Sequence, residues 1–170
     1  MGRGVRDLSI RQKVMSQGLT KMDFQIRTAT RDDAAVISEL IVRTLHESNG
    51  RDYSAQIIEQ VQRSFSPQAI LVLMVSRQVY VATFNQRVVA TASLDQDVVR
   101  SVFVEPAWQG KGLGKRLMEK FQSVAVSQGL KNLHVPSSIT AEGFYQSLGF
   151  DKIRDEYHGA ERTIIMQKRL

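Results

Sequence analysis

The sequence predicts a single α/β domain of the α+β kind, with a mixed, mostly antiparallel central sheet flanked by helices. Three observations carry this prediction. The 170 residues, of which 42% are hydrophobic and 24% charged, suit one domain with one hydrophobic core. Short β-branched runs alternate along the chain with segments of helical period. A two-residue turn separates two of the β-branched runs, so their strands are expected to be antiparallel neighbours.

The first elements expected after residue 22 are a strand and a helix. Residues 24–28 read as a short strand, and Thr30 followed by an arginine and two aspartates is typical of a helix N-terminus. Apolar residues recur at helical spacing from 34 to 45, and Ser48-Asn49-Gly50 then supplies a turn signal. A helix is therefore expected between these two signals.

A second helix and a hairpin are expected next. Residues 54–65 place apolar side chains on one helical face before Pro67. The apolar run 69–75 fits either a buried helix or a strand, and we favour a helix. Two β-branched runs, 79–84 and 87–94, then flank a two-residue turn, which predicts an antiparallel hairpin.

The second half of the chain begins with the valine-rich run 98–104, which predicts a third strand that ends before Pro106. The clearest amphipathic helix covers residues 113–125, and Gly129 is expected to end it. Further expected elements are a strand over 130–135, a helix over 140–148, and strands over 150–153 and 163–167. Residues 155–162, between the last two strands, are read as a loop.

A glycine-rich turn joins the third strand to the amphipathic helix, with the sequence Gln109-Gly110-Lys111-Gly112-Leu113-Gly114-Lys115. The first N–H groups of a helix lack intrahelical partners and carry the positive end of its dipole, so they bind anions. Glycines let the backbone approach a ligand closely, and the lysines add positive charge. The turn therefore predicts a phosphate or diphosphate site.

Two better-known phosphate motifs do not fit this turn. A nucleotide P-loop would need glycine at position 109 and serine or threonine at position 116, where the chain has Gln109 and Arg116. The dinucleotide pattern, started from Gly110 or Gly112, would need its last glycine at position 115 or 117, which hold lysine and leucine. Neither ATP nor NAD is the expected ligand.

A different signature does match. Gln109-x-x-Gly112-x-Gly114 fits the Q/R-x-x-G-x-G/A pattern of the GCN5-related N-acetyltransferase (GNAT) superfamily, and the chain resembles its small, bacterial-type members. Members typically continue with N-x-x-A-x-x-[LF]-Y-x-x-x-G-F, and this chain reads Ser138-x-x-Ala141-x-x-Phe144-Tyr145-x-x-x-Gly149-Phe150, which departs only at the first position. The order of elements from Phe24 onward is also similar. The resemblance implies the acyl-CoA N-acyltransferase fold.

The resemblance also implies a site for acetyl-CoA as co-substrate. Backbone amides of the glycine-rich turn would bind the pyrophosphate, and the strand ending at residue 104 would hydrogen-bond the pantetheine arm. The thioester would lie where the family splays this strand from the one over 130–135. Ser138 replaces an asparagine that contacts the pantetheine in many members, so a shorter or lost contact is expected. The implied cofactor-binding residues are Val102, Phe103, Val104, Gln109, Gly110, Lys111, Gly112, Leu113, Gly114, Lys115, Ser138 and Tyr145.

The catalytic residue implied by the resemblance is Tyr145, whose position often holds a general acid that reprotonates the departing thiolate. A phenol suits this role because its proton affinity is similar to that of a thiolate. The alternative is a tyrosine that only packs beside Phe144. The base that deprotonates the amine is not identified by the sequence. The candidates near the cleft are Asp95, Asp97 and Glu105, each of which is also explained as an ordinary turn or surface carboxylate. The histidines weighed beside them are read otherwise: His134 as a core or surface residue, His46 as the end of a helix and His158 as part of a late loop.

The expected function is that of an enzyme, an N-acetyltransferase that moves acetyl from acetyl-CoA directly to a primary amine of a small molecule or a protein. The chain has no cysteine, which excludes an acyl-cysteine intermediate, and its three scattered histidines predict no metal site. The alternative is a catalytically silent CoA-binding sensor or interaction module on the same fold. The resemblance implies that residues 43–53 and 155–162 form the acceptor pocket, and it implies a homodimer.

The formal charge of +6 does not by itself indicate a nucleic-acid partner. Residues 1–21 hold five basic residues and one acidic residue, so residues 22–170 carry only +2. We read residues 1–21 as a disordered leader or an extended start before Met22, and residues 22–170 as the domain; an organelle-targeting peptide is the alternative. No apolar run is long enough for a membrane span, so a cytoplasmic protein is expected.

Overall fold

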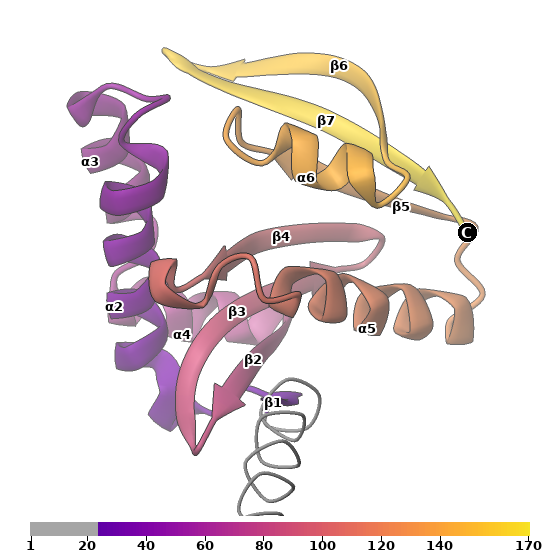
Figure 1. The fold of residues 1–170 in the computed structure, drawn as a ribbon, viewed down its shortest axis with the longest axis horizontal. Helices are drawn as coiled ribbons and strands as arrows, with labels where there is room; N and C mark the ends of the chain where they lie inside the picture. Colours follow the sequence, from indigo (N-terminus) through magenta and orange to yellow (C-terminus); the bar gives the residue numbers. More distant parts are fainter. Residues whose placement is uncertain (1–23) are drawn as a thin grey trace, which may run out of the picture.

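The computed structural model describes residues 24–170, and the expectations for residues 1–21 lie outside this part. Its centre is a seven-stranded sheet with the strand order β1-β2-β3-β4-β5-β7-β6 (Figure 1). Neighbouring strands are antiparallel except for β4 and β5, which are parallel. The expected fold class, a mixed and mostly antiparallel sheet flanked by helices, is confirmed.

The bounds of the elements are as follows. The strands are β1 (Phe24–Thr28), β2 (Gln78–Phe84), β3 (Arg87–Asp95), β4 (Val98–Val104), β5 (Asn132–Ser137), β6 (Asp151–His158) and β7 (Glu161–Arg169). The α-helices are α2 (Ala34–Thr44), α3 (Ala55–Arg63), α4 (Pro67–Ser76), α5 (Leu113–Ser127) and α6 (Glu142–Ser147). Short 3-10 turns cover Arg31–Asp33 and Pro106–Trp108, and a π-helical turn covers Leu45–Asn49.

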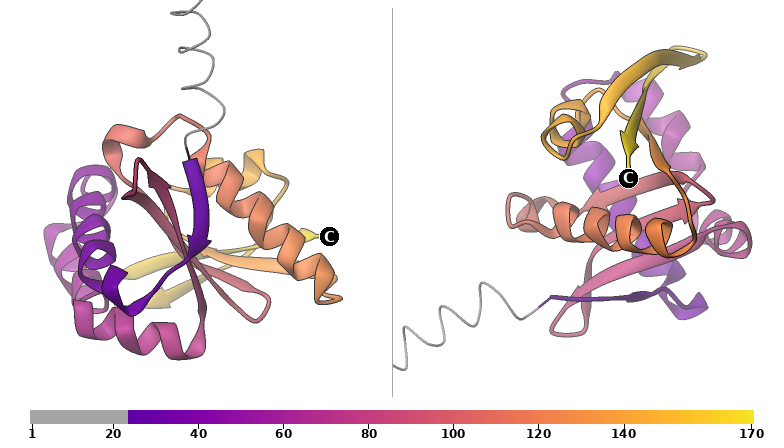
Figure 2. Two further views of the ribbon diagram at one scale, coloured as in Figure 1. Left: turned by 90° about the horizontal axis from the view of Figure 1, so that it is seen from below. Right: turned by 90° about the vertical axis from the view of Figure 1, so that its right-hand side faces the viewer.

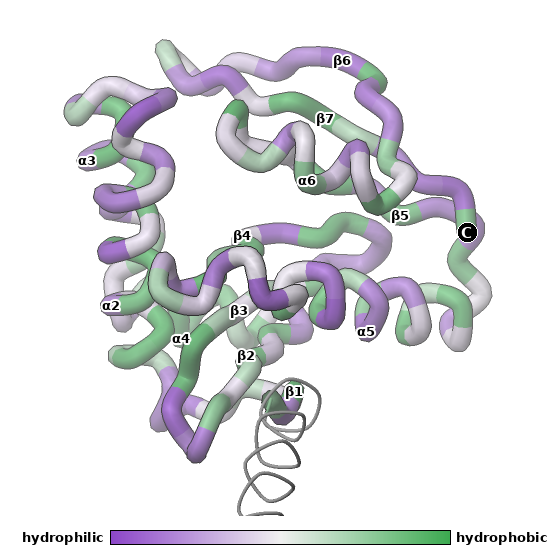
Figure 3. The backbone as a smooth tube through the Cα atoms, viewed as in Figure 1, coloured by the Kyte–Doolittle hydropathy of each residue, from purple (hydrophilic) through white to green (hydrophobic). Residues whose placement is uncertain are grey.

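The helices cover both faces of the sheet and enclose two hydrophobic clusters. Helices α2, α3 and α4 lie on one face, and α5 lies on the other (Figure 2). Ile37, Ile41 and Val81 belong to the cluster under α2–α4, whereas Phe121 and Phe150 belong to the cluster under α5 and α6. The central strands are hydrophobic, while the outer strand β6 is largely hydrophilic (Figure 3). Central strands that are covered by helices on both faces are expected to be hydrophobic along their whole length.

The helix starts follow capping rules. The Ser54 and Ser66 side chains accept hydrogen bonds from the N–H groups of Ile57 and Ala69, and Pro67 occupies the first turn of α4. These caps satisfy N–H groups that have no partner within the helix. The run over 69–75 is therefore a helix, as favoured, and α2, α3 and α4 stand between β1 and β2.

Two local expectations about turns are also met. Asn85 and Gln86 have φ values of 47° and 66°, which is the left-handed pair that a two-residue hairpin between β2 and β3 requires. Gly129 has a φ of 77° at the end of α5, where a left-handed residue terminates many helices.

Some of the predicted boundaries of strands and helices in the second half of the chain were wrong. Residues 155–162, read as a loop, form the ends of β6 and β7 and the tight turn between them, with Asp155 opposite Ile164 in the ladder. The many charged residues there lie on an outer strand, so their polarity does not prevent strand pairing. Strand β5 begins at Asn132 rather than residue 130, and α6 is shorter than the expected 140–148.

Asp33 ties the end of β1 to the start of α2. Its two carboxylate oxygens accept hydrogen bonds of 2.7 and 2.9 Å from the Arg27 guanidinium, and one also accepts from the Thr30 N–H. The Arg27 bond is the main cause that lowers the Asp33 pKa from 3.8 to about 2. A carboxyl with a lowered pKa stabilises the fold above its ordinary pKa, and this contribution is lost as the pH falls from 3.8 to about 2.

We expect Asp33→Asn to lower the free energy of unfolding at pH 7 by about 1 to 2 kcal/mol, a value discounted for the partial exposure of Arg27. The difference from the wild type should shrink between pH 4 and pH 2, because protonation then removes the same charge from the wild type. Urea unfolding at pH 7, 4 and 2.5 measures this. Asp32→Asn, at an exposed neighbour, is the control. A difference that stays constant with pH would contradict the assignment.

Within residues 24–170, no helix combines the length and the hydrophobicity needed to cross a bilayer.

Candidate active site

The site is a cleft between two diverging parallel strands. Strands β4 and β5, both within the described part of the chain, pair at Val98 and His134, next to a bond of 2.9 Å from the His134 N–H to the Asp97 carbonyl. Beyond this point the strands separate (Figure 1). The cleft has a volume of about 620 Å³, and its lining comes from the α2–α3 connection, α3, β4, the glycine-rich turn, α6 and the β6–β7 hairpin. A cavity of this size is typical of small-ligand sites.

The glycine-rich turn forms one end of the cleft. Gly110 and Gly112 have φ values of 74° and 83°, a conformation that residues with a Cβ adopt only at a cost. Helix α5 begins at Leu113, and its first bond runs from the Arg116 N–H to the Gly112 carbonyl. The N–H groups of residues 113–115 therefore precede the helical ladder and are free to bind an anion.

The third glycine of the turn has a packing role instead. A Cβ added to Gly114 would lie 2.9 Å from Cζ of Phe144, closer than real Cβ atoms come to other atoms. Helix α5 thus begins directly against the aromatic ring of α6. The two sequence motifs, one on each helix, form a single packed unit.

Gln109 fixes the start of the turn. Its amide nitrogen donates to the Val104 carbonyl at 3.0 Å and to the Ser48 hydroxyl at 2.9 Å. The first bond holds the turn against the end of β4, and the second holds it against the π-helical turn after α2. The side chain of Gln109 therefore positions the backbone of the turn.

A bulge in β4 turns its backbone at the middle of the cleft. The pairing of β3 and β4 shifts between Thr91 and Ser93, so that Ala92 faces two residues of β4. One of them, Ser101, has a φ of 56°, which is rare for a residue with a side chain. Bulges of this kind redirect side chains next to functional sites. Ser101 lines the cleft as a result.

Tyr145 lies on α6 and lines the same cleft. It is 4% exposed and its ring packs edge-on against Phe144 and Phe150. Burial raises its pKa above the ordinary value of 10, because the phenolate would lose its hydration. Within residues 24–170 its hydroxyl makes no hydrogen bond. The phenol therefore carries its proton at neutral pH and has no protein partner to hold it.

The sequence-predicted cofactor residues converge on this cleft. Eleven of the twelve line it, from β4, the glycine-rich turn, the β5–α6 loop and α6. Lys111 is the exception, since its Nζ lies 5.2 Å from the centre of the Trp108 ring. Ser138 lines the cleft, and its hydroxyl accepts from the Ala141 N–H at 3.2 Å. The glycine-rich turn and Tyr145 thus share one cavity.

Residues 49–170 match the family described as Acetyltransferase (GNAT) domain. The chain belongs to the GNAT acetyltransferase family. A curated relative, Serotonin N-acetyltransferase 2, chloroplastic, of Oryza sativa subsp. japonica, is 37% identical over 62 residues, which make up 36% of this chain and 31% of that relative. The alignment therefore spans about a third of the relative's length.

Solved structures show the same GNAT fold. A GCN5-related N-acetyltransferase of Rhodopseudomonas palustris is similar with a TM-score of 0.82 at 22% identity, over 86% of this chain and 95% of that one. The PaiA N-acetyltransferase of Thermoplasma acidophilum, in complex with coenzyme A, is similar with a TM-score of 0.74 at 17% identity. That alignment covers 88% of this chain and all of the other.

Most candidate bases lie outside the cleft of this GNAT domain. Asp97 pairs with the His134 ring at 3.2 Å, Asp95 lies 3.5 Å from Arg100, and His46 pairs with Gln62. None of these candidates lines the cleft. His158 does line it, together with Glu161, because the β6–β7 hairpin reaches over the cleft. Sequence analysis placed His158 in a loop, but it is the last residue of β6.

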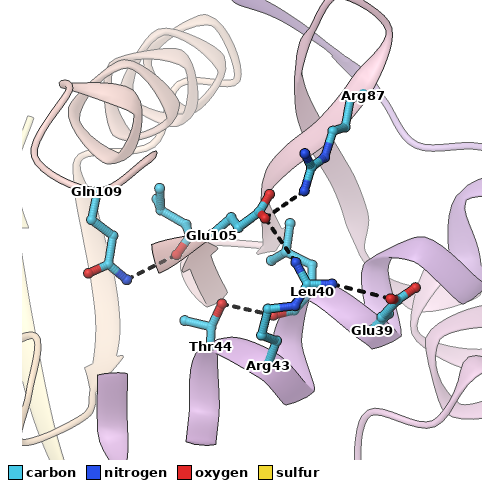
Figure 4. A network of polar contacts seen from close by, with 8 residues as sticks. Glu39, Leu40, Arg43, Thr44, Arg87, Glu105 and Gln109 are labelled. Atoms are coloured by element: carbon cyan, nitrogen blue, oxygen red, sulfur yellow. Dashed lines mark hydrogen bonds and ion pairs between the residues drawn. The ribbon is translucent and has the colours of Figure 1, made fainter. Parts of the chain in front are cut away.

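Glu105 is the clearest of these cases. It is 6% exposed, directly after β4, and does not line the cleft. One of its carboxylate oxygens accepts from Arg43 of α2 at 2.8 Å and from Arg87 of β3 at 2.7 Å (Figure 4). Two guanidinium groups donate to this carboxylate, and the contacts link α2, the β2–β3 hairpin and β4. The geometry gives Glu105 a structural role in the GNAT fold.

We expect Glu105→Gln to lower the free energy of unfolding by about 2 kcal/mol, because two charge-assisted hydrogen bonds are weakened at a buried site. Glu39→Gln, at a 71% exposed partner of the same Arg43, should cost less than about 0.5 kcal/mol. Urea unfolding measures both. An unchanged stability together with the loss of one limb of the pH–rate profile would show that Glu105 is a base after all.

Sequence analysis placed Tyr53 within the range 43–53 expected for the acceptor pocket, but it gave Arg77 and Arg100 no role. The Tyr53 hydroxyl accepts from the Ile139 N–H at 2.7 Å and donates to the Arg162 carbonyl at 3.1 Å, so it bridges the α2–α3 connection to both the β5–α6 loop and β7. Arg77 and Arg100 also line the cleft. No motif contains Arg77 or Arg100, and no local pattern could have found the contact of Arg77 with Ser101, because these two residues are 24 positions apart.

Proposed function

We propose that this GNAT protein transfers the acetyl group of acetyl-CoA directly to a primary amine of a small molecule or a protein. One observation carries the proposal: the glycine-rich start of α5 and Tyr145 line the same cleft, between strands that diverge. The first site suits a pyrophosphate, and the second suits a leaving group that needs a proton. The position of both within one cavity allows the two substrates to bind together.

Different residues of the chain would bind different parts of acetyl-CoA. Backbone N–H groups of residues 113–115, with the positive charge of Lys115, would hold the pyrophosphate. The edge of β4 at Val102 and Val104 would hold the pantetheine arm through its backbone groups. Because β5 has moved away from this edge, the backbone of β4 is not fully occupied by sheet pairing there.

In the transfer, the amine nitrogen forms a bond with the acetyl carbon, and the bond from that carbon to sulfur breaks. The nitrogen loses a proton, and the thiolate gains one from Tyr145. Burial raises the proton affinity of the phenolate, but it raises that of a thiolate in the same apolar cleft too, so proton transfer between the two remains feasible. His158 and Glu161 line the cleft and are the candidates to accept the amine proton, directly or through water.

Free thiol release from acetyl-CoA in the presence of an amine panel tests the proposal. The panel should include serotonin and tryptamine, because the rice relative is named a serotonin N-acetyltransferase, together with polyamines, amino acids and N-terminal peptides. We expect acetyl-CoA-dependent thiol release with at least one class. Binding of acetyl-CoA in calorimetry without turnover on any amine would instead support a CoA-binding sensor.

We also propose that the protein forms a homodimer through its C-terminal strands. The support is that β6 is an edge strand and that Ile153 and Tyr157 on it are 44% and 65% exposed. Exposed apolar side chains on an edge strand favour pairing with another chain. Sedimentation equilibrium of the wild type and of Tyr157→Lys tests this. The cytoplasmic location stays a prediction from the sequence.

A further inference from the structure

Two arginines lie together in the part of the cleft that the glycine-rich turn does not occupy. Arg77 stands between α4 and β2, and Arg100 stands on β4 directly before the bulge at Ser101. All three residues line the cleft. Ser101 precedes Val104, where the strand meets the turn, by three residues, or about 10 Å of strand. The arginines therefore lie away from the glycine-rich turn, in the part of the cleft that the proposed function leaves to the acceptor.

The positive charge of this pair is poorly compensated. Among residues 24–170, Arg77 has no ion pair, and its guanidinium donates a single bond of 3.4 Å to the Ser101 hydroxyl. Burial, and then the charge of Arg100, lower the Arg77 pKa from its ordinary value, and the smaller opposing effect of Asp95 does not offset them. Nε of Arg100 lies 3.5 Å from an Asp95 oxygen but is a buried nitrogen without a hydrogen bond. A buried donor without a partner is costly, and an anion beside the two guanidinium groups would compensate their charge.

The wall beside the arginines is apolar. Ile57, Ile58 and Val61 on α3 line the cleft, as does Phe65, whose ring packs edge-on against Phe103 of β4. This wall suits the apolar body of a ligand, and the guanidinium groups suit an anionic end. Neither feature is explained by acetyl-CoA bound at the glycine-rich turn.

We propose that the acceptor amine also carries an anionic group, a carboxylate or a phosphate, which binds to Arg77, Arg100 and the Ser101 hydroxyl. The inference rests on the proposed function and narrows its substrate class to amines that are acidic at their other end, with an apolar portion between. An apolar amino acid has this chemistry, whereas an arylalkylamine lacks the anionic end. Guanidinium groups bind both carboxylates and phosphates through paired hydrogen bonds.

Matched acceptor pairs test the inference when turnover is present. The pairs are tryptophan with tryptamine, phenylalanine with phenethylamine, and phosphoethanolamine with ethanolamine, which distinguish a carboxylate from a phosphate. We expect the anionic member of at least one pair to have a kcat/KM about tenfold higher or more. Preference for the simple amine in every pair would overturn the inference.

Variants of the two arginines test whether these residues cause the preference for anionic acceptors. We expect Arg77→Gln and Arg100→Gln each to raise the KM of the anionic acceptor by about tenfold, with little effect on the simple amine or on the KM of acetyl-CoA. Arg63→Gln is the matched control, because Arg63 lies on α3 outside the cleft and is 77% exposed. Equal effects of the variants on both members of a pair would contradict direct anion binding.

A binding measurement separates this inference from the proposed function. The CoA-loaded protein is titrated with 3-phenylpropionate, 3-phenylpropylamine, 3-phenylpropanol and inorganic phosphate, and affinity is read by calorimetry. Binding of an anion that Arg77→Gln abolishes supports the anion site even if no amine turns over, in which case only the proposed function fails. Turnover without anion binding overturns the inference alone, and the absence of both overturns both.

Discussion

Replacing Tyr145 by phenylalanine is expected to lower kcat by about 100-fold, the lower end of what a positioned general acid contributes. The KM of acetyl-CoA should change little, because the ring that lines the cleft remains. Folding stability should not fall, since within residues 24–170 the hydroxyl makes no hydrogen bond that the variant would lose. Steady-state thiol release at saturating acetyl-CoA measures kcat, and thermal unfolding measures stability.

Tyr80→Phe is the matched control for Tyr145→Phe. Tyr80 packs edge-on against Phe121 in the cluster under α5 and does not line the cleft, so its variant should keep the wild-type kcat. Because burial raises the pKa of Tyr145, its ionisation should give no alkaline limb in the pH–rate profile below its ordinary value of 10. A kcat of Tyr145→Phe within twofold of the wild type would show that Tyr145 only packs beside Phe144.

The second large effect is expected from Gly114→Ala. The added Cβ would meet the Phe144 ring at 2.9 Å, so either the ring or the start of α5 must move. Both border the cleft, and overpacking of this kind costs about 1 to 3 kcal/mol. We expect the KM of acetyl-CoA to rise about tenfold or more, because about 1.4 kcal/mol corresponds to tenfold in affinity. Calorimetry with CoA and steady-state kinetics measure the change.

Gly143→Ala provides the control for Gly114→Ala. Gly143 is exposed within α6, and nothing lies within 4 Å of a Cβ added there. Since alanine has the higher helix propensity, this variant should be neutral or slightly stabilising and should bind CoA normally. If Gly114→Ala binds CoA as tightly as Gly143→Ala does, then close packing of α5 against Phe144 does not shape the site.

Local chemistry explains the parts of the fold that sequence analysis predicted well. Ser54 caps α3, Asn85 and Gln86 adopt the left-handed turn, and Gly112 takes a positive φ at the start of α5. Each feature depends on one or a few neighbouring residues, whose conformational preferences are visible in the sequence. The same reasoning failed for residues 155–162, because a charged strand at the sheet edge has the composition of a loop.

In the candidate site, too, the short local motifs could be predicted from the sequence, whereas the contacts between distant residues could not. The glycine-rich turn and the motif around Tyr145 were visible in the sequence because each is a short run with fixed spacing. The sequence could not show that Gly114 packs against Phe144, since the contact joins two helices through the core. Nor could it show that Glu105 is neutralised by Arg43, 62 residues away, which turns a candidate base into a structural anion.

The sequence by itself determined the order of helices and strands, the anion-binding start of α5 and the acetyltransferase motifs. Only the tertiary structure decided that β5 diverges from β4, that the β6–β7 hairpin brings His158 and Glu161 over the cleft, and that Arg77 meets Ser101. The physical reason is that conformational preference acts between neighbours in the chain. Pairing across the sheet, burial and compensation of charge depend instead on the packing of segments that are far apart in the sequence.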